Sequence, residues 1–248
     1  MHRGTLGLLL LLAACDNTTT NNAPDAQPPP TQQGDLGYAT FTYNCGGSSD
    51  PQCNVDSDLA PVAASSQFPT LAAGSVFDLT AKVSASADAG AGTVLTVVPV
   101  STSFLDKDMT GTMQTAKRPG VSTVLAEEGG NIVDLTSVVI GTPDHIKILQ
   151  ATPTGSFQSG SITIGPGGVT ATSTAVFTFK FRAFVVDKNE NLLAGAFACN
   201  WVSSDSTIAN LTSDPKSNIA TVVSGNKGTA TVTVTLGTFT ANVTITVS

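Results

Sequence analysis

The sequence predicts an all-β protein built from two tandem β-sandwiches, and three observations indicate this. Hydrophobic and polar residues alternate strictly in the C-terminal half of the chain, as they do in half-buried β-strands. A similar pattern occurs about a hundred residues earlier, which indicates a second copy of the same unit. No stretch after the first fourteen residues has the hydrophobic period of an amphipathic helix.

The alternation is clearest over residues 228–247. One face carries Ala230, Val232, Val234 and Leu236, and the other carries threonines. The pattern resumes at Phe239 after a turn at Gly237, so the segment is predicted to be an antiparallel hairpin with threonine on its wet face. Upstream, another apolar face carries Phe177, Phe179, Phe181, Ala183 and Val185. A polar turn at 187–191 ends that strand, and a further strand carries Cys199 and the single tryptophan, Trp201.

Four pieces of this half follow one another in a family-specific order. They are the opening 143–148, the phenylalanine-rich strand with its turn at 187–191, the segment 201–205 followed by Ile208 and Ala209, and the strand from Gly228. Residues 143–248 thereby resemble the bacterial immunoglobulin-like domains of group 2 (Big_2). The resemblance implies an immunoglobulin-like β-sandwich in which Trp201 is a core residue and Ser203-Ser204-Asp205 is a turn.

The preceding segment is predicted to be a degenerate copy of this domain. The sequence from Gly120 aligns with the hairpin from Gly228 at an offset of 108, and Phe77 aligns with Phe179 at an offset of 102. One loop insertion explains the difference. We therefore expect a degenerate immunoglobulin-like sandwich at 61–142 and a Big_2-like sandwich at 143–248, after a cysteine-containing lead-in at 36–60. Thr142-Pro143 is the expected junction.

The N-terminus has the features of a secretory signal. Arg3 gives a short positive region, Leu6 to Leu12 form an apolar run, and small residues precede Cys15. Leu12-Ala13-Ala14-Cys15 resembles the lipobox of bacterial lipoproteins. The resemblance implies a signal peptide at 1–14 and acyl groups such as palmitate on Cys15, which would anchor the chain to the membrane. An ordinary signal peptide with a chance cysteine is the alternative. We favour the outer membrane or cell surface over the inner membrane.

Residues 15–35 are predicted to be a disordered tether. They contain mainly Thr, Asn, Gln and Pro, with almost nothing that could build a core. Such a stretch would hold the folded part of the chain away from the membrane surface.

Two of the remaining cysteines are predicted to form a disulfide. Cys45 and Cys53 are close in sequence, and Gly46-Gly47 lets the chain turn between them. Cys199 is expected to be a buried free thiol next to Trp201.

The residue types that carry catalysis are scarce. Without the signal peptide His145 is the only histidine, and no serine stands in a Gly-x-Ser-x-Gly motif. Glu127 and Glu128 fall in a hairpin turn, where carboxylates are solvated. No catalytic, cofactor or metal residues are therefore assigned, and we expect no enzyme and no cofactor.

Calcium binding is left open at one turn. Asp187, Asn189 and Asn191 have the spacing of an EF-hand start, but Leu192 and Ala198 replace the required glycine and glutamate. A second, weaker candidate is the group Asp50, Asp56 and Asp58. Neither is assigned as a metal site.

Charge excludes one class of partner. The chain carries a formal net charge of −7, with no cluster of basic residues, so nucleic acid is not an expected partner.

The sequence predicts a non-enzymatic, lipid-anchored envelope protein for adhesion, spacing or assembly, with an envelope protein or glycan as partner. The alternative is a module that binds carbohydrate, either peptidoglycan or a surface polysaccharide. That alternative needs exposed aromatic side chains, and the candidates are Trp201, Tyr38 and Tyr43.

Overall fold

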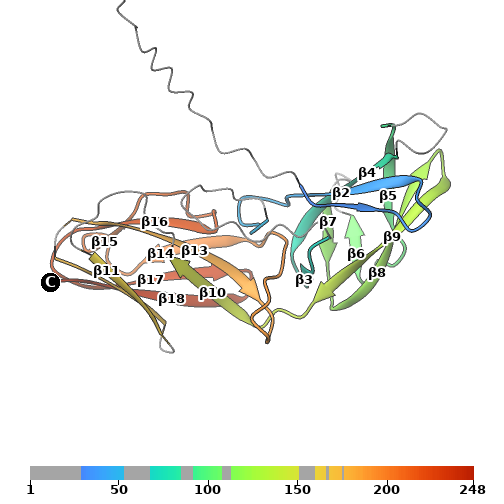
Figure 1. Cartoon of the computed structure of the whole chain (residues 1–248). Coiled ribbons are helices and arrows are strands. Elements are labelled where there is room, and N and C mark those ends of the chain that lie inside the picture. The colour runs from blue at the N-terminus through green and yellow to red at the C-terminus, as the bar shows by residue number, and fades with distance from the viewer. Residues whose placement is uncertain are drawn as a thin grey trace, which may run out of the picture.

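The structure is a computed structural model that describes residues 29–52, 68–84, 92–107, 113–150, 160–165, 168–174 and 176–248. Every regular element in these ranges is a β-strand (Figure 1), so the all-β prediction is confirmed. Across the same ranges there is no helix with the length and hydrophobicity needed to cross a membrane. The predicted signal peptide, Cys15, most of the predicted tether and Cys53 lie outside the described residues.

Nine strands form the first sandwich: β1 (Thr31–Gln33), β2 (Ala39–Asn44), β3 (Leu71–Ala72), β4 (Val76–Val83), β5 (Val94–Pro99), β6 (Leu105–Lys107), β7 (Met113–Ala116), β8 (Gly120–Glu128) and β9 (Asn131–Gly141). One layer has the order β1-β2-β4-β7-β6. The other has the order β5-β8-β9-β3, with β3 parallel to β9. A short pairing between β4 and β5 links the two layers.

Nine more strands form the second sandwich: β10 (His145–Gln150), β11 (Gly160–Gly165), β12 (Gly168–Ser173), β13 (Thr178–Val186), β14 (Cys199–Ser203), β15 (Ala209–Leu211), β16 (Ile219–Ser224), β17 (Gly228–Leu236) and β18 (Phe239–Val247). One sheet has the order β10-β13-β16-β15, and the other has the order β11-β12-β18-β17-β14. Strand β12 runs parallel to β18, and the other pairs in these two sheets are antiparallel.

Both sandwiches have the strand order of a constant-type immunoglobulin domain, A-B-E-D on one sheet and C-F-G on the other. Strands β10, β13, β16 and β15 are A, B, E and D of the second sandwich, and β14, β17 and β18 are C, F and G. In the first sandwich β2, β4, β7 and β6 take the first four positions, while β5, β8 and β9 take the others. The two tandem immunoglobulin-like sandwiches are therefore confirmed. The strands aligned by sequence are equivalent, since β4 and β13 are both B strands.

The first sandwich begins earlier than the sequence predicts. Residues 31–33 fall in the predicted tether and 39–44 in the predicted lead-in, yet both form strands of the first layer. Strand β2 buries Ala39, Phe41 and Tyr43, and this alternation is visible in the sequence. Strand β1 is polar on both faces, so it gives no such signal. The Asp134 carboxylate holds the turn between them, because it accepts hydrogen bonds from the backbone N–H groups of Leu36, Tyr38 and Ala39 at 2.7–2.8 Å.

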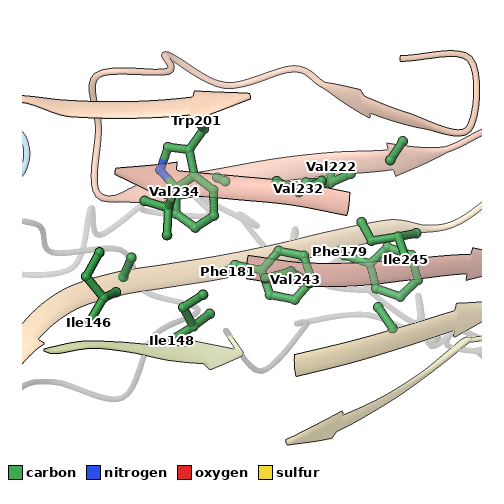
Figure 2. Close-up of a cluster of buried hydrophobic side chains, with 14 of the residues drawn as sticks. Ile146, Ile148, Phe179, Phe181, Trp201, Val222, Val232, Val234, Val243 and Ile245 are labelled. Atoms are coloured by element: carbon green, nitrogen blue, oxygen red, sulfur yellow. The ribbon is translucent and has the colours of Figure 1, made fainter. Parts of the chain in front are cut away.

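The core of the second sandwich contains the side chains that the alternation predicts. Phe179 and Phe181 from β13 meet Val232, Val234, Val243 and Ile245 from the facing sheet (Figure 2). Trp201 is only 2% exposed, and its indole N–H donates to the carbonyl of Ser217 at 2.9 Å. Burial of this apolar surface is the main force that holds the two sheets together.

Candidate functional site at the junction of the two sandwiches

The two sandwiches lie end to end (Figure 1), and a loop of the second forms backbone pairs with the first. This loop, residues 193–197, follows β13 and is called the insertion loop here. Ala194 donates its N–H to the Thr70 carbonyl at 2.8 Å and accepts from Ala72 at 2.9 Å. Ala196 exchanges two hydrogen bonds with Val76, at 2.7 and 2.9 Å. Pairing of the β type therefore continues across the junction.

The hydrophobic cores also exchange residues there. Ala194 is fully buried in the core of the first sandwich, whereas Ala72 from β3 packs in the core of the second. Gly195 has a φ of +101°, and a Cβ at this position would lie 2.1 Å from Ser75 Oγ. Only glycine permits both this backbone conformation and this approach. The backbone of the insertion loop at Gly195 therefore packs directly against Ser75 of the first sandwich.

A second segment, residues 45–52, lies against the second sandwich from the other direction. The Ser49 hydroxyl donates to the Phe197 carbonyl, and the Phe197 N–H donates back to Ser49 Oγ at 3.0 Å. The Arg182 guanidinium donates to the Pro51 carbonyl, and Asn218 N–H donates to the Ser48 carbonyl at 3.4 Å. This segment, the junction segment, is thus bonded to the insertion loop, β13 and the turn before β16.

Asp50 is the centre of the junction. Its carboxylate is fully buried and accepts from the Tyr43 hydroxyl, from Gln52 N–H at 3.0 Å and from Gly195 N–H at 3.3 Å. A longer contact of 3.4 Å comes from Gly46 N–H. One side chain therefore joins strand β2, the junction segment and the insertion loop.

Burial dominates the electrostatics of this pair. It raises the pKa of the Asp50 carboxyl above its usual value, against the opposite effect of the hydrogen bonds from Tyr43 and the backbone. Burial, followed by the nearby charge of Asp50, raises the pKa of Tyr43 well above 10.0. The Tyr43 hydroxyl therefore stays protonated and remains a donor to Asp50 at neutral pH.

The predicted cysteine sites are only partly within the described residues. Cys45 is in a disulfide bond and directly precedes Gly46 of the junction segment. Its predicted partner Cys53 and the predicted lipidation site Cys15 lie outside the described residues, so the pairing and the anchor stay predictions. Cys199 is a free thiol, 8% exposed, that donates to the Ser217 carbonyl at 3.1 Å. Burial raises the pKa of this thiol to about 12, so it is not a thiolate nucleophile at neutral pH.

His145 lies in a surface cluster of charged groups. Its Nδ1 is 2.8 Å from Asp144 Oδ2, and its Nε2 is 3.1 Å from Glu190 Oε1. Lys147 Nζ lies 2.8 Å from the other oxygen of Glu190. Both ring nitrogens thus face carboxylates, which is not the arrangement of a Ser-His or Cys-His pair. Exposed ion pairs of this kind contribute little to stability.

The turn that resembles an EF-hand start is closed by its own hydrogen bonds. Asp187 Oδ1 accepts from the N–H groups of Asn189 and Asn191 at 2.8 and 2.9 Å, and Oδ2 accepts from the Asn191 amide at 3.0 Å. These bonds lower the pKa of Asp187. Asp187 and Asn189 border a shallow pocket of about 360 Å³ together with Thr142, Asp144 and Lys188. Among the described residues no group of three or more His, Cys, Asp or Glu side chains could hold a metal ion.

Comparison with known proteins gives distant structural likenesses. No known family matches the sequence, and no curated protein matches it. Domains 4 and 5 of the S-layer protein SbsC are 17% identical over 68% of this chain and 89% of that one, with a TM-score of 0.27. The Escherichia coli adhesin FdeC is 14% identical over 73% of this chain and 60% of that one, with a TM-score of 0.29.

A glycosyl hydrolase family 2 member from Bacteroides cellulosilyticus is 13% identical, with a TM-score of 0.30, over 85% of this chain and 28% of that one. Likenesses this distant carry no argument about function. The immunoglobulin-like assignment rests on the strand order of this chain itself.

The sequence located the linker between the sandwiches at Thr142-Pro143, but sequence reasoning missed the contacts that hold the sandwiches together. Asp50 stands in a stretch rich in Gly and Ser, where an acidic residue is expected to be solvated. Gly195 lies between two alanines, and no sequence motif around it indicates a contact with the first sandwich. Their roles depend on contacts with residues more than a hundred positions away in the chain.

Proposed function

We propose that the chain is a lipid-anchored cell-envelope protein whose two immunoglobulin-like sandwiches form a fixed, non-enzymatic spacer for adhesion or assembly. The observation that carries this proposal is the junction. Tandem domains joined only by a short linker move relative to each other by default. Here backbone pairing, exchanged core residues and the buried Asp50 carboxylate all oppose such motion.

The N-terminal signals support the anchor. The lipobox-like Leu12-Ala13-Ala14-Cys15 would place acyl chains at the N-terminus of the mature chain, followed by the polar stretch before β1. The described chain begins beside the junction, where the Tyr43 N–H donates to the Pro30 carbonyl at 2.9 Å. The C-terminus lies at the end of the second sandwich that is remote from the first (Figure 1). On this proposal residues 143–248 are a Big_2-like domain and 31–141 its degenerate partner.

The chemistry of the described side chains supports a non-enzymatic role. The Cys199 thiol is buried and protonated, and His145 contacts carboxylates at the surface. The buried Asp50 carboxylate faces hydrogen-bond donors of the protein itself.

Trp201 and Tyr43 favour the spacer over the carbohydrate-binding alternative. Both side chains are 2% exposed, so neither offers a stacking face to a sugar ring. Of the three aromatic residues on which that alternative depends, only Tyr38 is exposed.

The anchor is tested by intact mass and membrane fractionation of the protein from its own cells. We expect the chain to begin at Cys15 with added acyl mass and to sediment with membranes, whereas the variant Cys15→Ser should be released from them. An unmodified Cys15 in the mature protein would overturn the anchor.

In-cell crosslinking with mass spectrometry distinguishes the spacer proposal from the carbohydrate-binding alternative. A reproducible protein partner supports assembly or adhesion, and capture of glycan alone supports carbohydrate binding.

A further inference from the structure

The sheet of β5, β8 and β9 is apolar on both of its faces, although only one of them covers the core. These strands are neighbours in the first sandwich (Figure 1) and turn Leu95, Val124 and Val138 inward. Their alternate residues point away from the core and form what is called the outer face here. The apolar residues of the outer face are Val94, Val98, Val100, Val121, Leu125, Ile132, Leu135 and Val139. The others are Thr96, Thr123, Glu127 and Ser137.

The apolar residues of the outer face form contiguous rows across the strands. Val98, Leu125 and Leu135 stand side by side in the middle row, and Val121 stands opposite Val139 nearer the junction. Five of the eight apolar side chains are 48–66% exposed, so the fold of the described residues leaves this face uncovered. Contiguous exposed apolar surface of this kind marks interaction sites.

The second sandwich shows how this protein builds a sheet face that contacts water. Its equivalent sheet, β14-β17-β18, carries threonine or asparagine at every described outward position except Val202. These residues are Asn200, Thr229, Thr231, Thr233, Thr235, Thr240, Asn242, Thr244 and Thr246. The two sheets have the same place in the fold, so the apolar outer face of the first sandwich is not a requirement of the fold.

We propose that two copies of this chain associate through the outer face. β-Sheets pack face to face when their twists match, about 10 Å apart, and a second copy supplies the same twist and the same apolar rows. Interfaces between identical chains are the more apolar ones and have few charges at their centre. Glu127 is the one charged side chain among the described residues of this face.

The position of Glu127 indicates how the two copies are oriented. A two-fold axis that crosses the strands at the middle row lays β8 of one copy antiparallel on β8 of the other. Glu127 then faces Thr123 of the second copy, and the two Glu127 side chains are separated by roughly 14 Å along the strands. An axis parallel to β8 would instead bring the two carboxylates together, which is unfavourable.

The size of the outer face predicts a weak dimer. Three strands about 4.8 Å apart and about 30 Å long present about 450 Å² of sheet, so two faces cover roughly 900 Å². Stable interfaces bury about 1,200 Å² or more, and weak ones bury less. We therefore expect a dissociation constant on the order of 100 µM, so the chain is largely monomeric below about 10 µM and spin-label distances in such dilute protein lie within one chain. The dimer extends the spacer role and does not depend on the lipid anchor.

The test is sedimentation equilibrium of the mature chain from residue 15, with Cys15→Ser so that no lipid is attached. Between about 5 and 500 µM we expect a reversible equilibrium between monomer and dimer. Amide NMR shifts recorded over the same range should change at Thr96, Thr123 and Ser137. The amides of Thr231 and Thr233, on the equivalent face of the second sandwich, should not change.

Three variants make the test specific. Leu125→Glu places two like charges against each other at the axis, and Val121→Glu adds a carboxylate at a position that is 60% exposed. Each should raise the dissociation constant at least about tenfold, because the dimer contains every substitution twice. Val202→Glu is the matched control, since Val202 is 52% exposed on the equivalent sheet, and it should dimerise like the parent.

The melting temperature of each variant shows that it is folded, and Val121→Glu decides the outcome if Leu125→Glu is not. The proposal is overturned if the parent chain stays monomeric up to about 500 µM, well above the expected dissociation constant. It is also overturned if Val121→Glu dimerises like the parent, or if Val202→Glu abolishes the dimer.

Discussion

At the residue scale, Asp50 joins parts of the chain that are distant in sequence. Each of its four partners is a hydrogen-bond donor, so an ionised carboxylate satisfies all of them. Burial nevertheless raises its pKa, which means that ionisation is harder in the folded protein than in the unfolded chain. The raised pKa of Asp50 therefore adds to the free energy of unfolding at low pH. This contribution is fully present below pH 3.8 and is lost as the pH rises through the raised pKa of the folded protein.

We predict that Asp50→Ala lowers the free energy of unfolding by about 2–4 kcal/mol, because several buried donors lose their acceptor. Asp50→Asn should lower it by only about 1 kcal/mol, since the Tyr43 hydroxyl can rotate and accept from the new amide. Urea unfolding followed at several pH values measures both effects. The deficit of Asp50→Asn relative to the wild type should narrow as the pH rises above 3.8, because only the wild type ionises there. A deficit that widens with pH would contradict the assigned direction of the pKa shift.

At the scale of elements, the insertion loop acts as a short strand of the first sandwich although it belongs to the second. Its backbone pairs with Thr70, Ala72 and Val76. The positive φ of Gly195 brings its backbone against Ser75, so the fit of the loop depends on a missing side chain.

Gly195→Ala should therefore lower the free energy of unfolding by about 3 kcal/mol or more, from backbone strain plus the clash with Ser75. Gly92→Ala is the matched control, because Gly92 has a φ of +89° but a Cβ added there would meet nothing within 4 Å among the described residues. The control should lower stability by about 1–2 kcal/mol, from backbone strain alone. Calorimetry measures the stability of both variants. Equal decreases in the free energy of unfolding would show that the packing of Gly195 against Ser75 does not contribute to stability.

At the scale of the whole molecule, the contacts across the junction make the two sandwiches one mechanical unit. The linker between β9 and β10 is short, residues 142–144, and the insertion loop and junction segment hold the sandwiches on either side of it. A spacer needs this property, because a flexible joint would not fix the position of one sandwich relative to the other.

We predict a narrow distribution of distances between spin labels placed on the two sandwiches. Val121→Cys and Val202→Cys place labels at exposed positions in a Cys199→Ala background. Pulsed electron spin resonance should give one narrow distance peak, and adding Asp50→Ala should broaden it. A broad peak in the otherwise intact protein would show that the sandwiches move independently and would remove the main support for the spacer proposal.

Local pattern explains why much of the fold was predictable. The period-two alternation of β13, β17 and β18 specifies which side chains are buried, and the confirmed sandwich follows from burying those faces. The resemblance of residues 143–248 to one family placed Trp201 in the core, where it lies. Strand β1 could not be predicted in the same way, because Thr31–Gln33 has no apolar face and is held by pairing with β2.

The fold class, the repeat and the buried faces follow from the amino-acid sequence alone, because they depend on residues that are neighbours along one strand. The contacts at the junction follow instead from the tertiary structure. Asp50 meets Gly195 across 145 positions of chain. The burial and bonding of such groups depend on which segments come together in space, and no local pattern encodes that choice.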